Sequence, residues 1–397
     1  SLLCLSGTVN ATTIYVNASY NGTSNGSITA PFTSIQEAIN NAISGDTIYI
    51  LNGFYNETIY IDKSNLTIVG ENKEGVVIHG NNTDNITDPC CALVILPSDL
   101  AKFNWTVVDY YVVTVNASNV TIRNLTIEHT RGVYNDALLY LEGSNFTVEN
   151  VRFLDSCNAI KGVFSDSMFS NLYGEAVEST SYGYEVKSAK INAKANNTVI
   201  RDSNISIVIE GDNNQILNNI VVNRTFTKDT DIASAVGIYV SGSSNTIIGN
   251  VVKKCYKGLQ LVNIKNSIVK DNILEDNHLF DLVLSSLGNV NLTNNVFTAS
   301  VLINGAKVIE LDKYTVLPSN LSKPLEDIVF ILKIVGVIEN NTTKIRIYYD
   351  ESILKLLGIP EDTLTMKYYN ETTQTWESVN CTVNTTENYI EAILNHF

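Results

Sequence analysis

A short motif built around an asparagine between hydrophobic residues returns along the middle of the chain. Its six copies carry Asn124, Asn150, Asn219, Asn250, Asn272 and Asn295. The last three asparagines are 22 and 23 residues apart. The 69 residues from Asn150 to Asn219 equal about three such intervals, and the longer step to Asn250 leaves room for an inserted loop.

Hydrophobic and polar residues alternate around each copy of the motif. Alternation of period two within a repeat near 22 residues predicts an all-β solenoid, a right-handed parallel β-helix with three short strands per rung. At about 22 residues per rung, the stretch from Gly45 to Ser300 would hold about eleven rungs, stacked about 4.8 Å apart. We expect the recurrent asparagines to lie at turns and to form a structural ladder from rung to rung.

An open end of a solenoid needs a cover, and the segment 34–43 is a candidate. Thr33 or Ser34 can cap the start of a short helix there, with Glu37 as a capping-box partner, and Gly45 ends it. The expected hydrophobic stripe consists of Ile35, Ala38, Ile39, Ala42 and Ile43.

The same region carries Thr13-Ile-Tyr-Val, Pro31-Phe-Thr-Ser-Ile-Gln-Glu-Ala-Ile, Ser44-Gly-Asp-Thr-Ile-Tyr-Ile and Gly53-Phe-Tyr. This series resembles the opening of NosD-like and pectin-lyase-like right-handed β-helix proteins, and the resemblance extends over about residues 13–300. It implies the fold but little about function, because this superfamily holds lyases, hydrolases, adhesins and structural proteins.

The repeat pattern changes after about Leu311. Strand-like segments at 328–334, 344–349, 363–369 and 389–394 are spaced as in a small antiparallel β-sandwich. Their order resembles the immunoglobulin-like domain near the C-terminus of many archaeal surface proteins. We therefore expect three parts, which are an N-terminal segment (1–12, a signal remnant or a docking strand), a β-helix (13–312) and an immunoglobulin-like sandwich (313–397).

Asn-x-Ser/Thr marks acceptors for N-linked glycans on secreted chains. The motif occurs roughly two dozen times, where roughly nine or ten would arise by chance. We interpret the excess as N-glycosylation. The expected acceptors are Asn10, Asn17, Asn21, Asn25, Asn56, Asn104, Asn223, Asn291, Asn320, Asn340, Asn370, Asn380 and Asn384. A turn asparagine before an alternating strand also creates the motif by accident, so we expect no glycan on the ladder residue Asn124.

Charge and composition limit the kinds of partner that this protein can bind. The net charge is -15, which offers no basic surface to a nucleic acid. No run of 18 or more apolar residues is present to span a membrane. Six cysteines in an apparently oxidising location indicate disulfides. The candidates are Cys4, Cys90, Cys91 and Cys157, with their connectivity open.

Residues for catalysis do not gather in the sequence. The arginine motif of pectate lyases is missing, as are the paired aspartates and Gly-His-Gly of polygalacturonases, and the four histidines are scattered. We therefore expect no catalytic residues, no metal site and no cofactor. Acidic pairs could bind Ca²⁺ only weakly, and they are Asp229 with Asp231 and Glu361 with Asp362.

These features favour an N-glycosylated archaeal cell-surface structural protein. It would be a subunit of an extracellular filament, sheath or surface layer, with copies of itself as partners. Two alternatives stay open. One is a carbohydrate-active β-helix enzyme, a polysaccharide lyase or a glycoside hydrolase, and the other is a glycan-binding adhesin.

Overall fold

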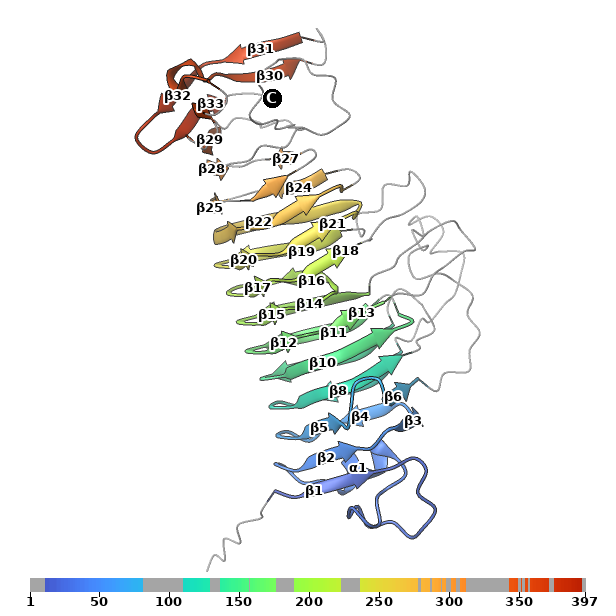
Figure 1. Cartoon of the computed structure of the whole chain (residues 1–397). Coiled ribbons are helices and arrows are strands. Elements are labelled where there is room, and N and C mark those ends of the chain that lie inside the picture. The colour runs from blue at the N-terminus through green and yellow to red at the C-terminus, as the bar shows by residue number, and fades with distance from the viewer. Residues whose placement is uncertain are drawn as a thin grey trace, which may run out of the picture. The chain divides into compact units, whose positions relative to one another are not determined.

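Short strands that pair in parallel with strands one rung away make up most of the protein (Figure 1). The computed structural model describes residues 11–80, 110–128, 136–156, 158–175, 189–222, 236–277, 280–285, 288–293, 295–297, 301–304, 308–311, 343–348, 351, 354–355, 358–370 and 375–394. The chain divides into two compact units, one of residues 1–199 and 203–205 and one of residues 200–202 and 206–397.

The first unit contains the only α-helix of the described chain, α1 (Ile35–Asn41). Its strands are β1 (Thr13–Val16), β2 (Thr47–Ile50), β3 (Gly53–Asn56), β4 (Ile59–Ile61), β5 (Thr67–Gly70), β6 (Val76–His79), β7 (Tyr111–Asn116), β8 (Thr121–Glu128), β9 (Ala137–Ser144), β10 (Thr147–Leu154), β11 (Asn158–Ser165), β12 (Met168–Ser170), β13 (Tyr173–Gly174) and β14 (Lys190–Asn196). Strand β15 (Val199–Arg201) lies at the division.

Three columns of parallel strands form the first unit. The first column runs β1–β2–β5–β8–β10–β12. The second runs β3–β6–β8–β10–β13, and the third runs β4–β7–β9–β11–β14. The long strands β8 and β10 belong to two columns each, so the chain turns a corner within them.

The second unit repeats this arrangement. Its parallel strands are β16 (Ser206–Glu210), β17 (Gln215–Leu217), β18 (Ile220–Val222), β19 (Val236–Ser243), β20 (Thr246–Ile248), β21 (Val251–Lys253), β22 (Lys257–Lys270), β23 (Ile273–Glu275), β24 (Phe280–Ser285), β25 (Gly288–Thr293), β26 (Val296–Phe297), β27 (Val301–Asn304) and β28 (Val308–Leu311). The columns are β17–β20–β22–β25–β28, β18–β21–β23–β26 and β16–β19–β22–β24–β27.

The expected fold class is confirmed, because three parallel columns joined by a right-handed chain path define a parallel β-helix. Among the described strands, the first column contains six strands in one unit and five in the other, and β15 at the division is its twelfth strand. This total is close to the predicted number of about eleven rungs.

Antiparallel pairing takes over towards the C-terminus of the second unit. Strand β29 (Thr343–Tyr348) pairs antiparallel with β33 (Tyr389–Leu394), which pairs antiparallel with β32 (Cys381–Asn384). A second pair joins β30 (Met366–Asn370) to β31 (Thr375–Val379), and η1 (Glu361–Thr363) is a short 3₁₀ helix. Strand β29 also pairs in parallel with β28, so β29, β33 and β32 continue the large sheet, and β30 with β31 forms a separate two-stranded sheet. These antiparallel strands lie in the region where the sandwich is expected. The expected strand at 328–334 and the boundary at 312/313 lie outside the described residues, so the three-part division stays a prediction.

The interior is built from identical positions of successive rungs. Ile48, Ile68, Ile122, Val148 and Phe169 are consecutive register partners, and each is at most 3% exposed. Strand alternation turns every second side chain inward, so in-register stacking places apolar side chains on apolar side chains. This stacked column is the hydrophobic core that the alternating sequence pattern predicts.

Helix α1 packs on β1, β2 and β4 at the first rung, as expected of a cap. Ile35, Ala38 and Ile39 are buried, and the Ser34 hydroxyl accepts a hydrogen bond from the Glu37 amide at 3.2 Å. The predicted stripe extends too far at one end, because Ile43 is 44% exposed. The helix ends at Asn41, and the Ile43 amide instead donates to the Asp46 carboxylate at 2.8 Å. Among the described residues no helix is long and apolar enough to cross a membrane.

Side chains from the β-helix satisfy both ends of α1. The Glu57 carboxylate accepts hydrogen bonds from the Ser34 hydroxyl (2.8 Å) and from the Ile35 and Gln36 amides (2.9 and 3.0 Å). The Lys63 ammonium donates to three carbonyls at the opposite end, 2.8–2.9 Å away. These groups are the orphan donors and acceptors of a helix, and the two charges have the signs that its dipole favours.

We expect Glu57→Ala to lower the free energy of unfolding of the first unit by about 1–3 kcal/mol, because two helix amides and a hydroxyl lose a charged acceptor. Thermal denaturation followed by circular dichroism measures this loss. Glu37→Ala is the matched control, since Glu37 is an exposed carboxylate on the same helix. Equal effects of the two substitutions would contradict the assigned role of Glu57.

Candidate functional site: the asparagine ladders and the glycan acceptors

A buried asparagine ladder runs through the second unit. Asn219, Asn250, Asn272 and Asn295 are each at most 2% exposed. The Nδ2 atom of each of the first three donates to Oδ1 of the next, at 2.8–3.0 Å. The same Oδ1 atoms also accept backbone amides, and each Nδ2 reaches a backbone carbonyl as well. A buried amide group is tolerable only when its polar atoms are paired in this way.

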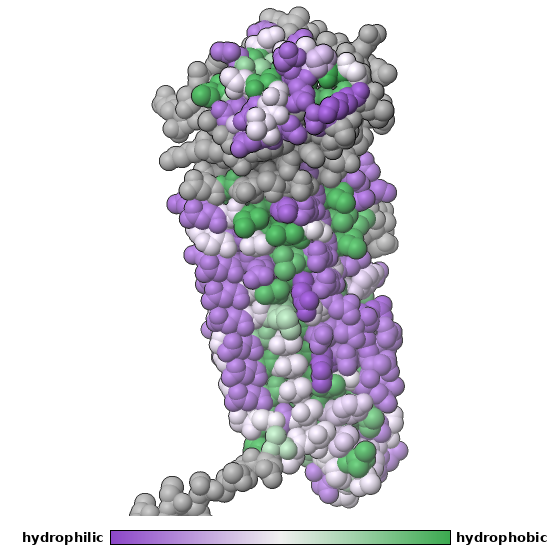
Figure 2. Space-filling model, turned by 60° about the vertical axis from the view of Figure 1, so that its left-hand side comes forward, coloured by the Kyte–Doolittle hydropathy of each residue, from purple (hydrophilic) through white to green (hydrophobic). Residues whose placement is uncertain are grey.

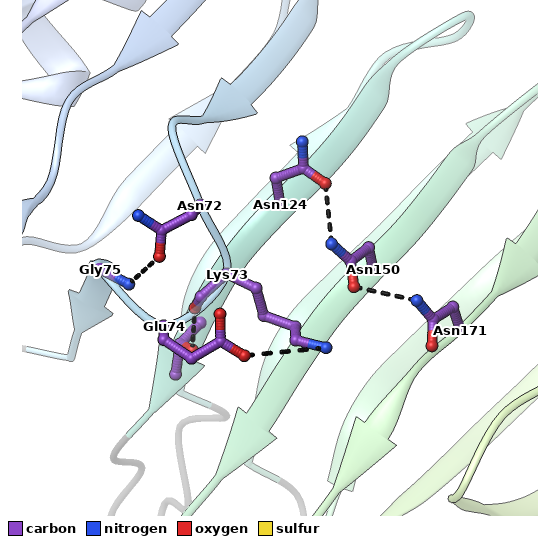
Figure 3. A network of polar contacts seen from close by, with 8 residues as sticks. Asn72, Lys73, Glu74, Gly75, Asn124, Asn150 and Asn171 are labelled. Carbon is purple, nitrogen blue, oxygen red and sulfur yellow. Dashed lines mark hydrogen bonds and ion pairs between the residues drawn. The ribbon is translucent and has the colours of Figure 1, made fainter.

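A second ladder lies in the first unit and is closer to solvent (Figure 3). Asn150 donates through Nδ2 to Asn124 Oδ1 at 2.9 Å, and Asn171 donates to Asn150 Oδ1 at 2.9 Å. All three have positive φ angles, from 51° to 58°. Asparagine tolerates this left-handed conformation, so each residue turns the chain from one column to the next.

The ladder of Figure 3 begins at Asn124 because the preceding rung has a glycine and a loop in place of the turn asparagine. A loop there holds Asn72, whose Oδ1 accepts the Gly75 amide at 2.7 Å, and Lys73, whose carbonyl accepts the Thr126 hydroxyl at 2.7 Å. Gly70 occupies the place below Asn124. A Cβ atom at Gly70 would lie 2.0 Å from the Asn124 carbonyl oxygen, so only glycine fits.

The six asparagines that the repeat suggested as one ladder thus occupy two neighbouring columns. Asn124 and Asn150 are left-handed turn residues, and the buried positions after them are Leu125 and Val151. In the second unit the left-handed turn residue is Asn218, and Asn219 is the buried residue that follows it. Between Asn150 and Asn219 the asparagine of the motif therefore shifts by one residue, from the turn position to the buried position after it. The single ladder that we expected is wrong, and the six asparagines belong to two ladders.

Sequence reasoning overlooked further polar stacks. The Asn214 amide donates to Asn245 Oδ1 at 2.9 Å, and the Asn245 amide donates to the Ser267 hydroxyl at 3.0 Å, with all three side chains buried. Asn-Asn doublets were the available signal. In Asn213-Asn214, as in Asn218-Asn219, the first residue is left-handed and the second is buried.

An outer turn ladder accounts for several Asn-x-Thr motifs. The Asn119 Nδ2 donates to Asn65 Oδ1 at 2.9 Å, and the Asn65 Nδ2 donates to the Ser44 hydroxyl at 2.8 Å. The residue two places after each asparagine is a threonine on the outer face, and Thr67 pairs in register with Thr121. A left-handed turn, an inward apolar residue and an outward β-branched residue thus reproduce the acceptor motif for structural reasons.

The threonines of the first column form a row of register partners along the first unit. Thr13, Thr47, Thr67, Thr121 and Thr147 follow one another on consecutive strands. In Figure 2, where the left-hand side of Figure 1 has come forward, a narrow stripe between hydrophilic side chains is pale in its lower part and green in its upper part. Because Thr67 and Thr121 complete the motifs that begin at Asn65 and Asn119, the sugar-acceptor motif and the strand pattern overlap along the threonine row.

The turn ladder also influences one carboxylate. Asp166 occupies a left-handed turn position and accepts hydrogen bonds from the Ser165 hydroxyl at 2.7 Å and the Asn197 Nδ2 at 3.0 Å. These two hydrogen bonds lower the pKa of Asp166 below its ordinary value. Asp166 therefore stays ionised and continues the turn ladder as an acceptor.

The expected glycan acceptors have a different environment from the ladder residues. Asn21, Asn25, Asn56 and Asn380 are exposed, and Asn17 and Asn384 are half-buried. The Oδ1 atoms of Asn17 and Asn25 accept the amides of Ser19 and Ser27 at 3.0 Å. This contact turns the carboxamide so that its Nδ2, the atom that would carry a sugar, has no partner among the described residues.

Several candidate residues lie outside the described part of the chain. They are Asn10, Asn104, Asn223, Asn320, Asn340, Cys4, Cys90, Cys91, Cys157, Asp229 and Asp231. Asn291 and Asn370 lie in β25 and β30. Glu361 and Asp362 lie in η1, and no group of three or more potential metal ligands is assembled among the described residues. Of the cysteines that the structure describes, Cys255 is buried and Cys381 is a half-buried free thiol.

The outer face of the second column in the first unit groups aromatic and charged side chains. His79 Nδ1 lies 3.0 Å from the Glu128 carboxylate, and the His79 ring centroid lies 4.9 Å from that of Phe54. Further along, the Arg152 guanidinium lies 5.8 Å from the Tyr173 ring centroid. Burial and the hydrogen bond to Glu175 raise the pKa of the Tyr173 hydroxyl above its ordinary value.

We expect Asn250→Ala to destabilise the second unit by about 3 kcal/mol or more. The substitution removes the buried hydrogen bonds that Asn250 Oδ1 accepts from the amide and Nδ2 of Asn219, and those that Asn250 Nδ2 donates to Asn272 Oδ1 and the Ile216 carbonyl. Asn150→Gly, in the ladder nearer to solvent, keeps the left-handed turn and should cost only about 1 kcal/mol, because water can replace the lost partner. Chemical denaturation of the two variants measures the difference. Similar losses would show that the two ladders are energetically alike.

Comparison with known proteins agrees with this fold. A family model described as "Periplasmic copper-binding protein (NosD)" matches residues 220–314. No curated protein matches the chain. The expected resemblance to NosD-like repeats is confirmed, and it falls on the second unit and not on the N-terminal residues that first indicated it.

Several solved structures are similar at low sequence identity. An exopolygalacturonase from Thermotoga maritima has 12% identity and a TM-score of 0.45, over 79% of this chain and 88% of that one. A polygalacturonase from Erwinia carotovora ssp. carotovora has 15% identity and a TM-score of 0.44, over 77% and 94%. A lacto-N-biosidase from Eubacterium ramulus has 12% identity and a TM-score of 0.39 over 75% of this chain, which spans only 59% of that enzyme.

The parallel columns make the protein a right-handed parallel β-helix. Part of it is similar to NosD repeats.

Proposed function

We propose that the protein is an N-glycosylated, extracellular structural β-helix that assembles with copies of itself into a filament, sheath or surface layer. The observation that carries this proposal is the contrast between two kinds of acceptor motif. Ladder asparagines such as Asn119 engage Nδ2 in the fold, whereas Asn17, Asn25 and Asn56 leave Nδ2 without a partner among the described residues. Selection for acceptors beyond the ladder explains the excess of motifs.

The rungs favour a structural role. Their polar side chains are occupied in holding rung to rung, and the buried amides of the Asn219–Asn295 ladder are paired on both sides. Parallel strands joined by such ladders resist local opening, because each strand is hydrogen-bonded to two neighbours. A rigid unit of this kind suits a load-bearing surface assembly.

Assembly requires a contact between copies. We propose that the apolar segment 1–12 supplies it by adding a strand to a neighbouring copy, the mode of recognition known as β-augmentation. An archaeal cell surface, the immunoglobulin-like character of the C-terminal sheets and a disulfide among Cys4, Cys90, Cys91 and Cys157 are further parts of this proposal. The carbohydrate-active enzyme and the adhesin remain alternative hypotheses.

We expect glycans on Asn17 and Asn25 and none on Asn65, Asn119 or Asn124. Among the described residues, the carboxamides of Asn17 and Asn25 have only a local contact through Oδ1, whereas those of Asn65, Asn119 and Asn124 are hydrogen-bonded to residues of other rungs. Peptide mapping by mass spectrometry of protein from its native source measures occupancy at each site. Unmodified Asn17 and Asn25 together with a modified Asn119 would overturn the division into two kinds of motif.

We expect native material to contain ordered polymers, and removal of residues 1–10 to leave dispersed subunits that are still folded, because Thr12 and its hydrogen bonds to Asp46 and Thr47 are kept. Negative-stain electron microscopy shows the assembly state, and circular dichroism verifies that the truncated chain keeps its β structure. Dispersed monomers in native material at high concentration would contradict the structural role.

A further inference from the structure

Phe54 is an apolar side chain on the outside of the first unit. It is 56% exposed, although its neighbour in β3, Tyr55, is only 2% exposed. The Tyr55 hydroxyl donates to the Leu51 carbonyl at 2.7 Å, and burial raises the pKa of Tyr55 to about 12. With Tyr55 held inward, strand alternation requires Phe54 and Asn56 to point outward together.

Asn56 is therefore an exposed acceptor two residues from an exposed ring on the same face of the same strand. It begins Asn56-Glu57-Thr58. On the next rung its register partner is His79, whose ring centroid lies 4.9 Å from that of Phe54 at an interplanar angle of 37°. The Glu128 carboxylate, 3.0 Å from His79 Nδ1, holds that ring in place.

We propose that Phe54 and His79 form a platform on which the N-linked glycan of Asn56 packs. This inference rests on the proposed glycosylation and adds a contact surface for one particular glycan. The C–H faces of a pyranose ring are weakly apolar, and covering Phe54 with them removes exposed aromatic surface from water. The first sugar is bonded to Nδ2 of Asn56, which is two residues from Phe54 and is the register partner of His79. The glycan can therefore reach the platform without any movement of the backbone.

The same spacing recurs at other expected acceptors. Tyr15 precedes Asn17 by two residues in and after β1, and Tyr368 precedes Asn370 by two residues in β30. The Tyr15 ring also packs on an aromatic side chain of the next rung, with its centroid 5.8 Å from that of Tyr49. Tyr15 and Tyr49 thus repeat at Asn17 the arrangement of Phe54 and His79 at Asn56, with an aromatic residue two places before the acceptor and a ring partner on the next rung.

A thermodynamic cycle of four proteins tests the platform. They are the wild type, Phe54→Ala, Asn56→Gln and the double variant, all produced in a host that glycosylates the chain. We expect Phe54→Ala to lower Tm by about 2–4 °C when Asn56 carries its glycan, and by clearly less in the Asn56→Gln background. Removal of the Asn56 glycan by an endoglycosidase should also be several-fold faster in Phe54→Ala.

Tyr60→Ala is the matched control. Tyr60 is 48% exposed and lies on the neighbouring strand β4, but the residue two places after it is Asp62 and not an acceptor. Its substitution should change Tm equally with and without the Asn56 glycan. Its effect on the rate of glycan removal from Asn56 should be negligible.

Two outcomes would overturn the platform. An Asn56 found unmodified by peptide mapping removes the ligand, while occupancy of Asn17 and Asn25 still decides the proposed function separately. Additive effects of Phe54→Ala and Asn56→Gln on a modified protein would show that Phe54 does not contact the sugar. The platform is supported if the loss of Tm caused by Phe54→Ala depends on the Asn56 glycan and the loss caused by Tyr60→Ala does not.

Discussion

In-register pairing of parallel strands one rung apart is the constraint on which the whole protein depends. Each strand alternates inward and outward side chains, so a slip of one residue would exchange the core for the surface. Correct register stacks Ile48, Ile68, Ile122 and Val148 into one apolar column. The same register stacks like polar residues at the corners, and there the ladders form.

The corners explain why asparagine is so frequent. A turn of one residue between two strands needs a positive φ, which asparagine adopts at small cost, and its carboxamide can donate and accept along the stack. The environment of an asparagine differs between neighbouring positions of a rung. Asn150 lies at a left-handed turn near solvent, whereas Asn250, one place further along its rung, is enclosed and paired on both sides. One residue type therefore fulfils two roles that a short motif does not separate.

Asparagine also links the fold to the surface chemistry. The turn at Asn119 and the outward Thr121 reproduce an acceptor motif because the backbone needs the first residue and the strand favours the second. At Asn17 and Asn25 the motif has no partner from another rung, and Oδ1 is used locally. Among the described residues, a hydrogen bond from the carboxamide to another rung is thus the feature that distinguishes a structural motif from a free acceptor.

The period near 22 residues and the alternation within it were enough to predict the parallel β-helix and about how many rungs it has, and the apolar stripe that follows Ser34 was enough to predict the capping helix. These features are local or repeat regularly, and the residues that satisfy them adjoin in sequence. The single ladder and the helical position of Ile43 were wrong, because each depended on a contact made across rungs or turns. Ile43 leaves the helix for a hydrogen bond with Asp46, and the glutamate that caps α1 is Glu57, over twenty residues from the amides it binds. Sequence by itself determined which residues can stack, and only the tertiary structure decided which atoms meet, because a shift of one residue between neighbouring rungs changes every cross-rung partner.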